Sequence, residues 1–272
     1  MHANYRIIIS ISSDIGFELA KSWLKSGDKV IGTYRTWNTN LDEISNHQNL
    51  TLLKLDFDRK HKIKTLPSVV RKLGTWEVLV IAAGRQEPIG NFEGLNFSDW
   101  TEGVRVNFLD QINIVHQLLP IRSKSTDTGP SVLFFAGGGT NNSVNNYSAY
   151  TISKIGLIKM CELLSTEVPS VKFSIVGPGW VKTKIHLPTI IDAGKQTKEN
   201  FKKTVEMLAG NDCVPISNVI ESCNWIINQK TKIVSGRNFS TKFDQFNQSL
   251  IDELSADVDM YKLRRNKNDW TK

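Results

Sequence analysis

Tyr150 and Lys154 are residue types whose spacing could support proton chemistry. On a helix, residues four apart lie on one face, about one turn from each other. A free phenol has a pKa of about 10 and is a poor acid or base at neutral pH. A neighbouring ammonium favours the phenolate and lowers that pKa, which suits general acid–base catalysis. The same spacing is also common in solvated surface pairs, so the surrounding elements must decide between the two interpretations.

The N-terminal residues predict a strand, a turn and a helix. An apolar run at residues 5–11 indicates a buried strand, residues 17–25 have helical spacing, and residues 29–34 indicate a second strand. In such a βαβ unit a dinucleotide lies at the helix N-terminus, where unpaired N–H groups and the helix dipole attract phosphate. In the alternative interpretation, Ser12 to Asp14 only cap the helix.

Further apolar runs alternate with helical patterns along the chain. This alternation predicts an α/β protein, a Rossmann-like doubly wound parallel sheet in a single domain. One continuous helix is expected over residues 97–112. The later strands are expected at residues 52–57, 78–84, 131–136, 172–177 and 234–240.

The stretch from Ile9 to Gly16 resembles the cofactor loop of the short-chain dehydrogenase/reductase family, Thr-Gly-x-x-x-Gly-x-Gly. Only its last glycine matches, because Ser10 and Asp14 take the places of the first two. Ser12 and Ser13 can donate hydrogen bonds to phosphate. The carboxylate of Asp14 favours a helix N-terminus but repels a pyrophosphate bound there.

Two later motifs resemble the same family in order and spacing. Residues 81–84, Ile-Ala-Ala-Gly, stand where the family has Asn-Asn-Ala-Gly, and residues 178–183 match its Pro-Gly-x-Val-x-Thr turn, which holds the nicotinamide carboxamide. The resemblance covers residues 5–240. It implies that Tyr150 is the general acid in reduction and the base in oxidation, while Lys154 lowers its pKa and holds the nicotinamide ribose.

Asn107 and the chain before Tyr150 complete the expected active site. The resemblance implies that Asn107 holds a relay water, although a buried asparagine also commonly binds backbone carbonyls. The family has a serine 12 to 14 residues before the tyrosine, but counting back from Tyr150 reaches Gly137 and its neighbours. Either Thr140 replaces that serine or Tyr150 alone binds the carbonyl. The candidate substrate-contacting residues are therefore Gly137, Gly138 and Thr140.

The end of the second strand bears on the choice of cofactor. Dinucleotide folds that select NAD usually carry an acid here, whereas this chain has Tyr34 and Arg35. Arg35 can pair bidentately with a 2′-phosphate, which favours NADP(H) over NAD(H). Asp56 resembles the family's adenine-contacting aspartate, with a strand-end turn residue as the alternative. The expected cofactor-binding residues are Ser10, Ser12, Ser13, Asp14, Ile15, Gly16, Tyr34, Arg35, Asp56, Phe57, Ala82, Ala83, Gly84, Pro178, Gly179, Val181 and Thr183.

The C-terminal third is more polar. Residues 1–250 are expected to form the cofactor-binding and catalytic domain, with a substrate lid at residues 184–210 and a polar tail at residues 251–272. In the family the region after residue 184 covers the substrate. The tail weakly resembles short-chain enzymes encoded with bacterial surface-polysaccharide pathways, which implies a sugar-derived substrate.

Composition narrows the class of protein further. The 272 residues are 40% hydrophobic and 22% charged, as in ordinary globular proteins. The net charge of +7 comes from scattered basic residues without a recognition module, so no nucleic-acid partner is expected. No apolar run reaches the roughly 18 residues of a membrane span. The three cysteines have neither metal-site nor disulfide spacing, so we expect a cytoplasmic protein without a metal.

The combined patterns predict an oxidoreductase that interconverts a carbonyl and an alcohol with NADP(H). Two alternatives remain: a non-catalytic NADP-binding regulator or scaffold, and a nucleotide-sugar epimerase or dehydratase on the same fold. The family resemblance implies a homodimer or homotetramer built through the helices of Asn107 and Tyr150.

Overall fold

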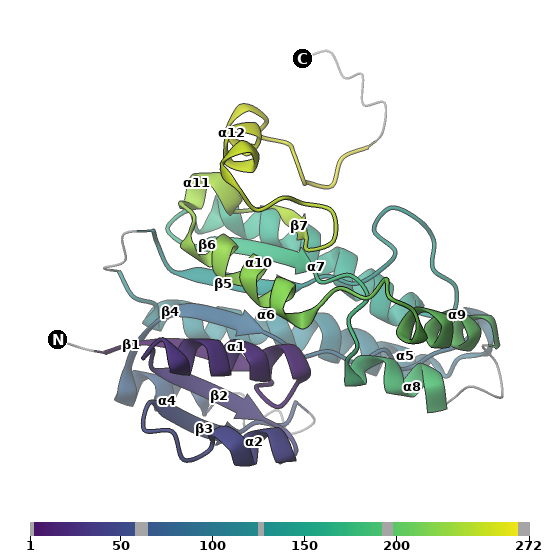
Figure 1. The fold of residues 1–272 in the computed structure, drawn as a ribbon, viewed down its shortest axis with the longest axis horizontal. Helices are drawn as coiled ribbons and strands as arrows, with labels where there is room; N and C mark the ends of the chain where they lie inside the picture. The colour runs from purple at the N-terminus through teal and green to yellow at the C-terminus, as the bar shows by residue number, and fades with distance from the viewer. Residues whose placement is uncertain (1–2, 58–64, 125–127, 192–197, 266–272) are drawn as a thin grey trace.

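A seven-stranded sheet forms the centre of the computed structural model, which describes residues 3–57, 65–124, 128–191 and 198–265 (Figure 1). Every strand pairing is parallel, and the order is β3-β2-β1-β4-β5-β6-β7. The order reverses between β1 and β4, which confirms the doubly wound α/β fold. The strands are β1 Ala3–Ile9, β2 Val30–Tyr34, β3 Leu50–Lys54, β4 Gly74–Ile81, β5 Ser131–Phe135, β6 Lys172–Gly177 and β7 Asn238–Ser240.

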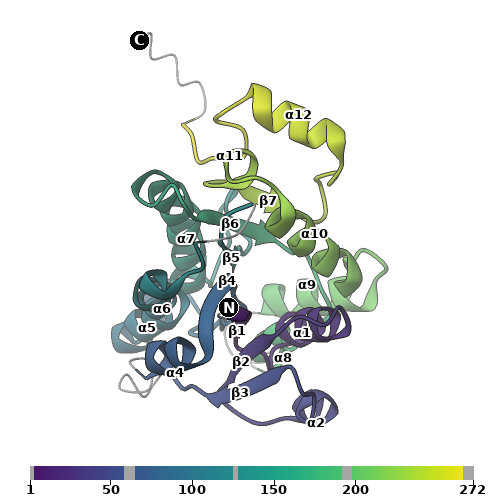
Figure 2. The same cartoon turned by 90° about the vertical axis from the view of Figure 1, so that its left-hand side faces the viewer.

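The sheet is apolar on both faces because helices cover both of them. In β1, Ile8 packs into one core while Ile7 and Ile9 pack into the other. Figure 2 shows α1 and α10 on one side of the sheet, and α4, α6 and α7 on the other. The first face also receives α2, α11 and α12. The helices are α1 Asp14–Lys25, α2 Thr39–Ile44, α4 Leu66–Leu73, α5 Phe97–Val104, α6 Asp110–Leu118, α7 Ser148–Glu167, α10 Ile216–Asn228, α11 Thr231–Val234 and α12 Gln248–Ala256.

The helix expected over residues 97–112 is interrupted. A π-helical turn, η2 (Arg105–Leu109), separates α5 from α6, and the Asp110 N–H donates to the Arg105 carbonyl five residues earlier. Single π-helical turns inside helices often occur at functional sites. This wider turn contains Asn107.

Two strand expectations are corrected. β3 ends at Lys54, so Asp56 and Phe57 lie in the loop beyond the strand rather than within it. The strand expected over residues 234–240 is confined to β7, because α11 ends at Val234 and Gly236 has a positive φ of 80°. That backbone conformation is incompatible with a continuous strand and suits glycine.

The segment from residue 184 to Ala209 lies beyond the carboxyl ends of the strands (Figure 1). It contains a 3-10 turn, η4 (Lys184–His186), then α8 (Leu187–Ile191) and α9 (Lys198–Ala209). Residues 192–197 of the expected lid lie outside the described residues. Across the described ranges, no helix is both long enough and apolar enough to span a bilayer.

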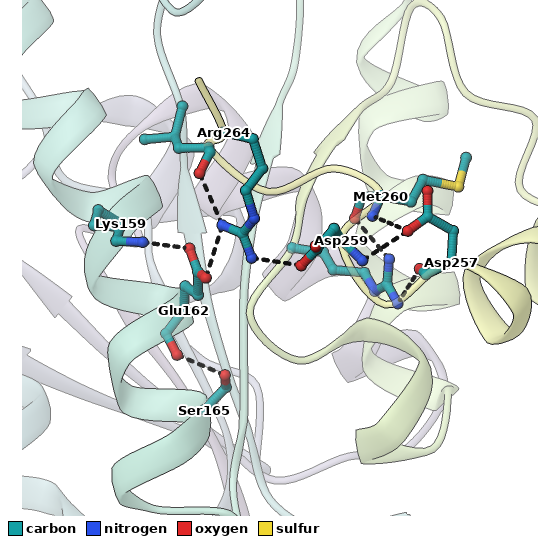
Figure 3. A network of polar contacts seen from close by, with 9 residues as sticks. Lys159, Glu162, Ser165, Asp257, Asp259, Met260 and Arg264 are labelled. Carbon is teal, nitrogen blue, oxygen red and sulfur yellow. Dashed lines mark hydrogen bonds and ion pairs between the residues drawn. The ribbon is translucent and has the colours of Figure 1, made fainter. Parts of the chain in front are cut away.

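The chain after residue 250 begins inside α12, whose Leu250 and Leu254 are buried. The buried Arg237 guanidinium donates to the carbonyls of Leu254, Asp257 and Met260 at 2.7, 3.0 and 2.6 Å. Figure 3 shows Arg264 between Glu162 of α7 and Asp259, at 2.9 and 2.6 Å. Residues 248–264 therefore pack against the sheet edge and the far end of α7.

Candidate active site

A cavity of about 1140 Å³ lies where the strands end. It is lined by the loop after β1, by residues following β2 to β6, by the start of α7 and by η4 and α9. The reversal of strand order between β1 and β4 opens a crevice at this edge, which is where doubly wound proteins bind ligands.

Tyr150 and Lys154 lie on the cavity wall, in the first two turns of α7. The Lys154 Nζ is 5.6 Å from the centroid of the Tyr150 ring, and only 3% of the lysine is exposed. The helical spacing thus brings the two groups together inside a cavity rather than on a solvated surface.

Burial shifts both groups toward their neutral forms. It raises the pKa of Tyr150 to about 12 and lowers the pKa of Lys154 to about 8. This differs from the expectation that the ammonium lowers the pKa of the phenol. The physical reason is loss of water, which disfavours the charged form of each group. At neutral pH the phenol therefore carries a proton that it can donate, beside a lysine that is still mostly charged.

Gly137 explains why a serine is missing before Tyr150. A Cβ built on Gly137 would lie 2.6 Å from Cε1 of Tyr150 and 2.9 Å from its hydroxyl oxygen. The phenol ring therefore occupies the space that a side chain at this position would need. A Cβ on Gly138 would meet no atom within 4 Å. Gly137, Gly138 and Thr140 all line the cavity.

Asn107 acts on the loop after β4 and does not line the cavity. Its side-chain amide donates to the carbonyls of Arg85 and Gly103 at 2.9 and 3.0 Å, and its Oδ1 accepts from the Arg85 N–H at 3.0 Å. A Cβ on Gly84 would be 3.5 Å from Asn107 Oδ1 and 3.6 Å from Lys154 Nζ. Asn107 thus fixes the backbone that faces Lys154, in agreement with the structural alternative for a buried asparagine.

The loop after β1 has the shape of a glycine turn although serine replaces the glycine. Ser10 has φ +67°, a left-handed conformation that side chains disfavour. Its carbonyl accepts from the Ser13 hydroxyl at 2.8 Å, and that hydroxyl in turn caps α1 by accepting from the Gly16 N–H. A Cβ on Gly16 would lie 2.6 Å from the Ser10 oxygen, so the close packing requires glycine there.

Asp14 is the first residue of α1, and its carboxylate is held by the segment after β6. The Lys184 N–H donates to Asp14 Oδ2 at 2.7 Å, and Lys184 Nζ lies 3.7 Å from Oδ1. The negative charge expected to repel a pyrophosphate therefore has a hydrogen-bond donor and a cation beside it.

At the other end of the cavity, Arg35 is exposed and lines the wall with Asp56 and Phe57. Tyr34 does not line the cavity, because its ring packs on the core and, edge-on, against Trp37 at 5.3 Å. Gly16 does not line the cavity either. The other expected cofactor residues, from Ser10 to Thr183, do line the cavity.

Sequence reasoning missed a group of polar side chains on the cavity wall. Two features of the sequence could have indicated them, namely the asparagines after residue 140 and the polar composition of α9. The group comprises Arg85, Gln86, Glu87, Asn141, Asn142, Asn145, His186, Glu199, Asn200 and Lys203.

The sheet order and the cavity define a Rossmann-type protein, and comparison with known proteins gives its family. A sequence profile described as short chain dehydrogenase matches residues 5–190, so the chain belongs to that family and the predicted resemblance is confirmed. Its members are oxidoreductases, and the fold implies a nicotinamide dinucleotide cofactor.

Two curated relatives carry names in agreement with this family. An uncharacterized oxidoreductase of Schizosaccharomyces pombe is 23% identical over 192 residues, which are 70% of this chain and 76% of that protein. The short-chain dehydrogenase/reductase family 9C member 7 of Mus musculus is 29% identical over 196 residues, which are 66% of this chain and 58% of that protein.

Solved structures share the fold. A short chain dehydrogenase/reductase of Saccharomyces cerevisiae is 22% identical with a TM-score of 0.78, covering 92% of this chain and 99% of its own. A variant actinorhodin polyketide ketoreductase with NADPH is 22% identical with a TM-score of 0.74, covering 88% of this chain and 95% of its own.

The cavity wall fits the cofactor that the family implies. Ala82 and Ala83 have small side chains and Gly84 has none, and Asp14 and Ile15, whose N–H groups lie in the first turn of α1, line the same cavity. A side chain larger than that of Gly84 would contact Lys154 Nζ. The backbone at Gly84 therefore lies close to Lys154 Nζ on the cavity wall.

Proposed function

We propose that this protein interconverts a carbonyl and an alcohol with NADP(H). The observation that supports the proposal is the buried Tyr150 and Lys154 pair on the wall of a cavity that continues to the start of α1 and to Arg35. Acid–base groups, the first N–H groups of a helix and the guanidinium of Arg35, all along one cavity, suit a phosphorylated dinucleotide and a substrate beside it.

Proton transfer is assigned to Tyr150. A bound nicotinamide cofactor supplies the hydride in reduction and accepts it in oxidation. Tyr150 Oη donates its proton to the carbonyl oxygen in reduction and takes a proton from the alcohol in oxidation. The Lys154 ammonium, 5.6 Å from the ring, stabilises the phenolate that remains after donation. Asn107 contributes by holding the backbone at residues 84–85 in place.

Arg35 is proposed to select NADP(H) by pairing with the 2′-phosphate. It is exposed on the cavity wall, and no ion pair within the described ranges engages it. Hydrogen bonds to charged groups are worth about 1.5–3 kcal/mol, so Arg35→Asp should weaken NADPH binding by about tenfold or more.

The test is titration of the wild type and Arg35→Asp with NADPH and with NADH. NADH affinity should change little in the variant, because NADH lacks the 2′-phosphate. Lys54→Asp is the matched control, since Lys54 is exposed at the end of β3 but does not line the cavity. Equal losses for both cofactors would refute the assignment of Arg35.

The substrate end of the cavity favours a polyhydroxylated, sugar-derived carbonyl or alcohol. Asn141, Asn142 and Asn145 line it from one side, and Glu199, Asn200 and Lys203 from α9. Amide and charged groups bind hydroxyls, whereas an apolar ketone would leave them unpaired. The fold accommodates such a reaction elsewhere: an aldohexose dehydrogenase of Thermoplasma acidophilum is 17% identical with a TM-score of 0.72, covering 88% of this chain and 92% of its own.

The proposed lid covers this end through contacts with the start of α7. Thr189 of α8 bonds the Tyr147 hydroxyl at 2.7 Å, and Asn200 of α9 accepts from the Asn146 amide at 2.8 Å. Residues 184–191 and 198–210 are therefore proposed to exclude water from the substrate. Turnover of aldoses and alditols, compared with apolar ketones of similar size, tests the substrate class.

A non-catalytic NADP-binding protein is the second candidate, and the absence of a hydroxyl at position 137 favours it. The two candidates differ in one measurement. NADPH binding without oxidation across a panel of sugar carbonyls would support the binding protein, whereas consumption of NADPH would support the enzyme.

A homodimer is proposed through the outward side of η2 and α7. Ile152 and Leu163 are eleven residues apart on α7, about three turns, and therefore lie on one face. They are 51% and 46% exposed, and Leu109 of η2 is also exposed. Light scattering measures the oligomeric state.

A further inference from the structure

Asp14 connects two segments that are 170 residues apart in the sequence. Its carboxylate stands at the start of α1, within the loop that faces the proposed phosphates. The backbone N–H of Lys184 donates to it at 2.7 Å. Lys184 directly follows Thr183, the last residue of the Pro-Gly-x-Val-x-Thr turn, and begins η4. The start of α1 is thereby joined to the turn that follows β6.

The backbone hydrogen bond, rather than the ion pair, carries most of this connection. A short N–H bond to a carboxylate is charge-assisted, and such bonds are roughly twice as strong as bonds between neutral groups. The ammonium of Lys184 is 3.7 Å away, and the side chain of Lys184 is 56% exposed, so solvent screens its attraction. The acceptor at position 14 therefore matters more than the charge at position 184.

The segment from Lys184 to Ile191 is held at two places. Asp14 holds its beginning, and Tyr147 holds Thr189 in α8. Between them, His186 stacks on Trp180 with ring centroids 5.0 Å apart. Removal of the Asp14 bond would leave the beginning of η4 without its anchor to α1, while the Thr189 contact remained.

We propose that Asp14 is a positioning residue that couples phosphate binding at the start of α1 to the placement of residues 183–191. An anionic phosphate at this helix N-terminus repels the Asp14 carboxylate and so favours its arrangement on the Lys184 N–H. By linkage, the bond to Lys184 in turn favours phosphate binding. The coupling rests on the proposed function, whereas the anchor itself does not.

The anchor is tested without cofactor by hydrogen exchange of the backbone amides of residues 183–191. Asp14→Asn keeps an oxygen acceptor and removes the charge, and Asp14→Ala removes both. Loss of the bond should make these amides exchange about tenfold faster or more in Asp14→Ala, whereas Asp14→Asn, which keeps a weaker neutral bond, should exchange at a rate between those of wild type and Asp14→Ala. Equal exchange in wild type and Asp14→Ala would overturn the anchor.

The coupling is tested by how far NADPH slows the exchange of the same amides. It should slow them in wild type and in Lys184→Met, which keeps the backbone donor, and should slow them much less in Asp14→Ala. Lys182→Met is the matched control for loss of a neighbouring charge. If NADPH protects residues 183–191 equally in wild type and Asp14→Ala, the coupling is refuted.

Different results would contradict the proposed function and the role of Asp14. A wild type that does not bind NADPH would contradict the proposed function and the coupling together, while cofactor-free exchange would still decide the anchor. Because the coupling depends on the negative charge at position 14, NADPH should slow the exchange less in Asp14→Asn than in wild type, and equal slowing in the two would refute the repulsion as its cause.

Discussion

The cavity has a catalytic wall, which carries Tyr150 and Lys154, and a phosphate wall, which is the loop after β1. The two walls differ in how closely their sequences follow the family pattern. On the catalytic wall, Tyr150, Lys154 and the turn at residues 178–183 match the family pattern residue by residue. On the phosphate wall, the loop after β1 departs from the pattern at Ser10 and Asp14, yet it has the form of a glycine turn. Ser10 adopts a left-handed φ, and Ser13 caps the helix. Side-chain chemistry defines the first wall, and backbone conformation defines the second.

This difference predicts that substitutions on the catalytic wall change turnover, while substitutions on the phosphate wall change stability and cofactor affinity. In the proposed mechanism, residues on the first wall contribute atoms that react or contact the substrate. Ser10 contributes a backbone shape, which another residue can provide if it tolerates the same dihedral angles.

Removal of the Tyr150 hydroxyl has the largest expected effect. Tyr150→Phe should lower kcat by about 10²–10⁴-fold, the range for loss of a general acid. Cofactor affinity should stay close to wild type, because the ring and its packing on Gly137 remain. Steady-state kinetics and NADPH titration measure the two quantities. Wild-type turnover in this variant would remove Tyr150 from the mechanism.

A single methyl group at position 137 should have the next largest effect. The Cβ of Gly137→Ala would clash with the Tyr150 ring, and displacement of a catalytic group by about 1 Å can cost about 10²-fold in rate. Gly138→Ala is the matched control, because its Cβ meets open space. Comparison of kcat for the two variants checks this, and equal activities would contradict the packing of Tyr150 on Gly137.

The pH dependence of the reaction should report on Lys154. Its pKa is lowered to about 8 by burial, whereas that of Tyr150 is raised to about 12, so the lysine loses its proton first as pH rises. We expect kcat/KM for reduction to be level below pH 8 and to fall above it by up to about tenfold per pH unit. In Lys154→Arg the fall should move to higher pH, because arginine keeps its charge. A profile unchanged in that variant would assign the fall to another group.

The smallest effect is expected on the phosphate wall. Ser10→Gly relieves a left-handed strain of about 1–2 kcal/mol but adds about 0.5–1 kcal/mol of chain entropy to the unfolded state. A net stabilisation of up to about 1 kcal/mol should appear in urea unfolding. Ser10→Ala keeps the strain and serves as the control. A less stable Ser10→Gly would show that the serine hydroxyl, rather than the dihedral angle, matters at this position.

The fold could be predicted from the sequence because apolar runs alternate with helical patterns. Ile7 to Ile9 can only be buried on both faces, and the similar runs of β4 and β5 imply a covered parallel sheet, whereas β7, Asn-Phe-Ser, has no such signal. The π-helical turn at Asn107 could not be predicted, because no proline or glycine within residues 105–109 marks it. It depends on packing, including that of Phe108 on Gly156 of α7.

Most of the residues expected in the site line the cavity, but Tyr34, Gly16 and Asn107 do not. Spacing placed Tyr150 beside Lys154, but it could not show that Tyr34 packs inward or that the Asn107 amide is engaged by Arg85 and Gly103. The bond between Asp14 and Lys184 joins distant parts of the chain and has no local sequence signal.

The packed C-terminal segment also shields the open edge of the sheet. β7 is the last strand, and its outward Asn238 N–H donates to the Tyr261 carbonyl at 2.9 Å. The bonds from Arg237 to the same segment hold that carbonyl in place. An uncovered edge strand is a template on which another chain can add a strand and begin aggregation. Residues 257–261 therefore cover the N–H side of β7 at Asn238, and a chain without them is expected to leave that edge open to pairing with another chain.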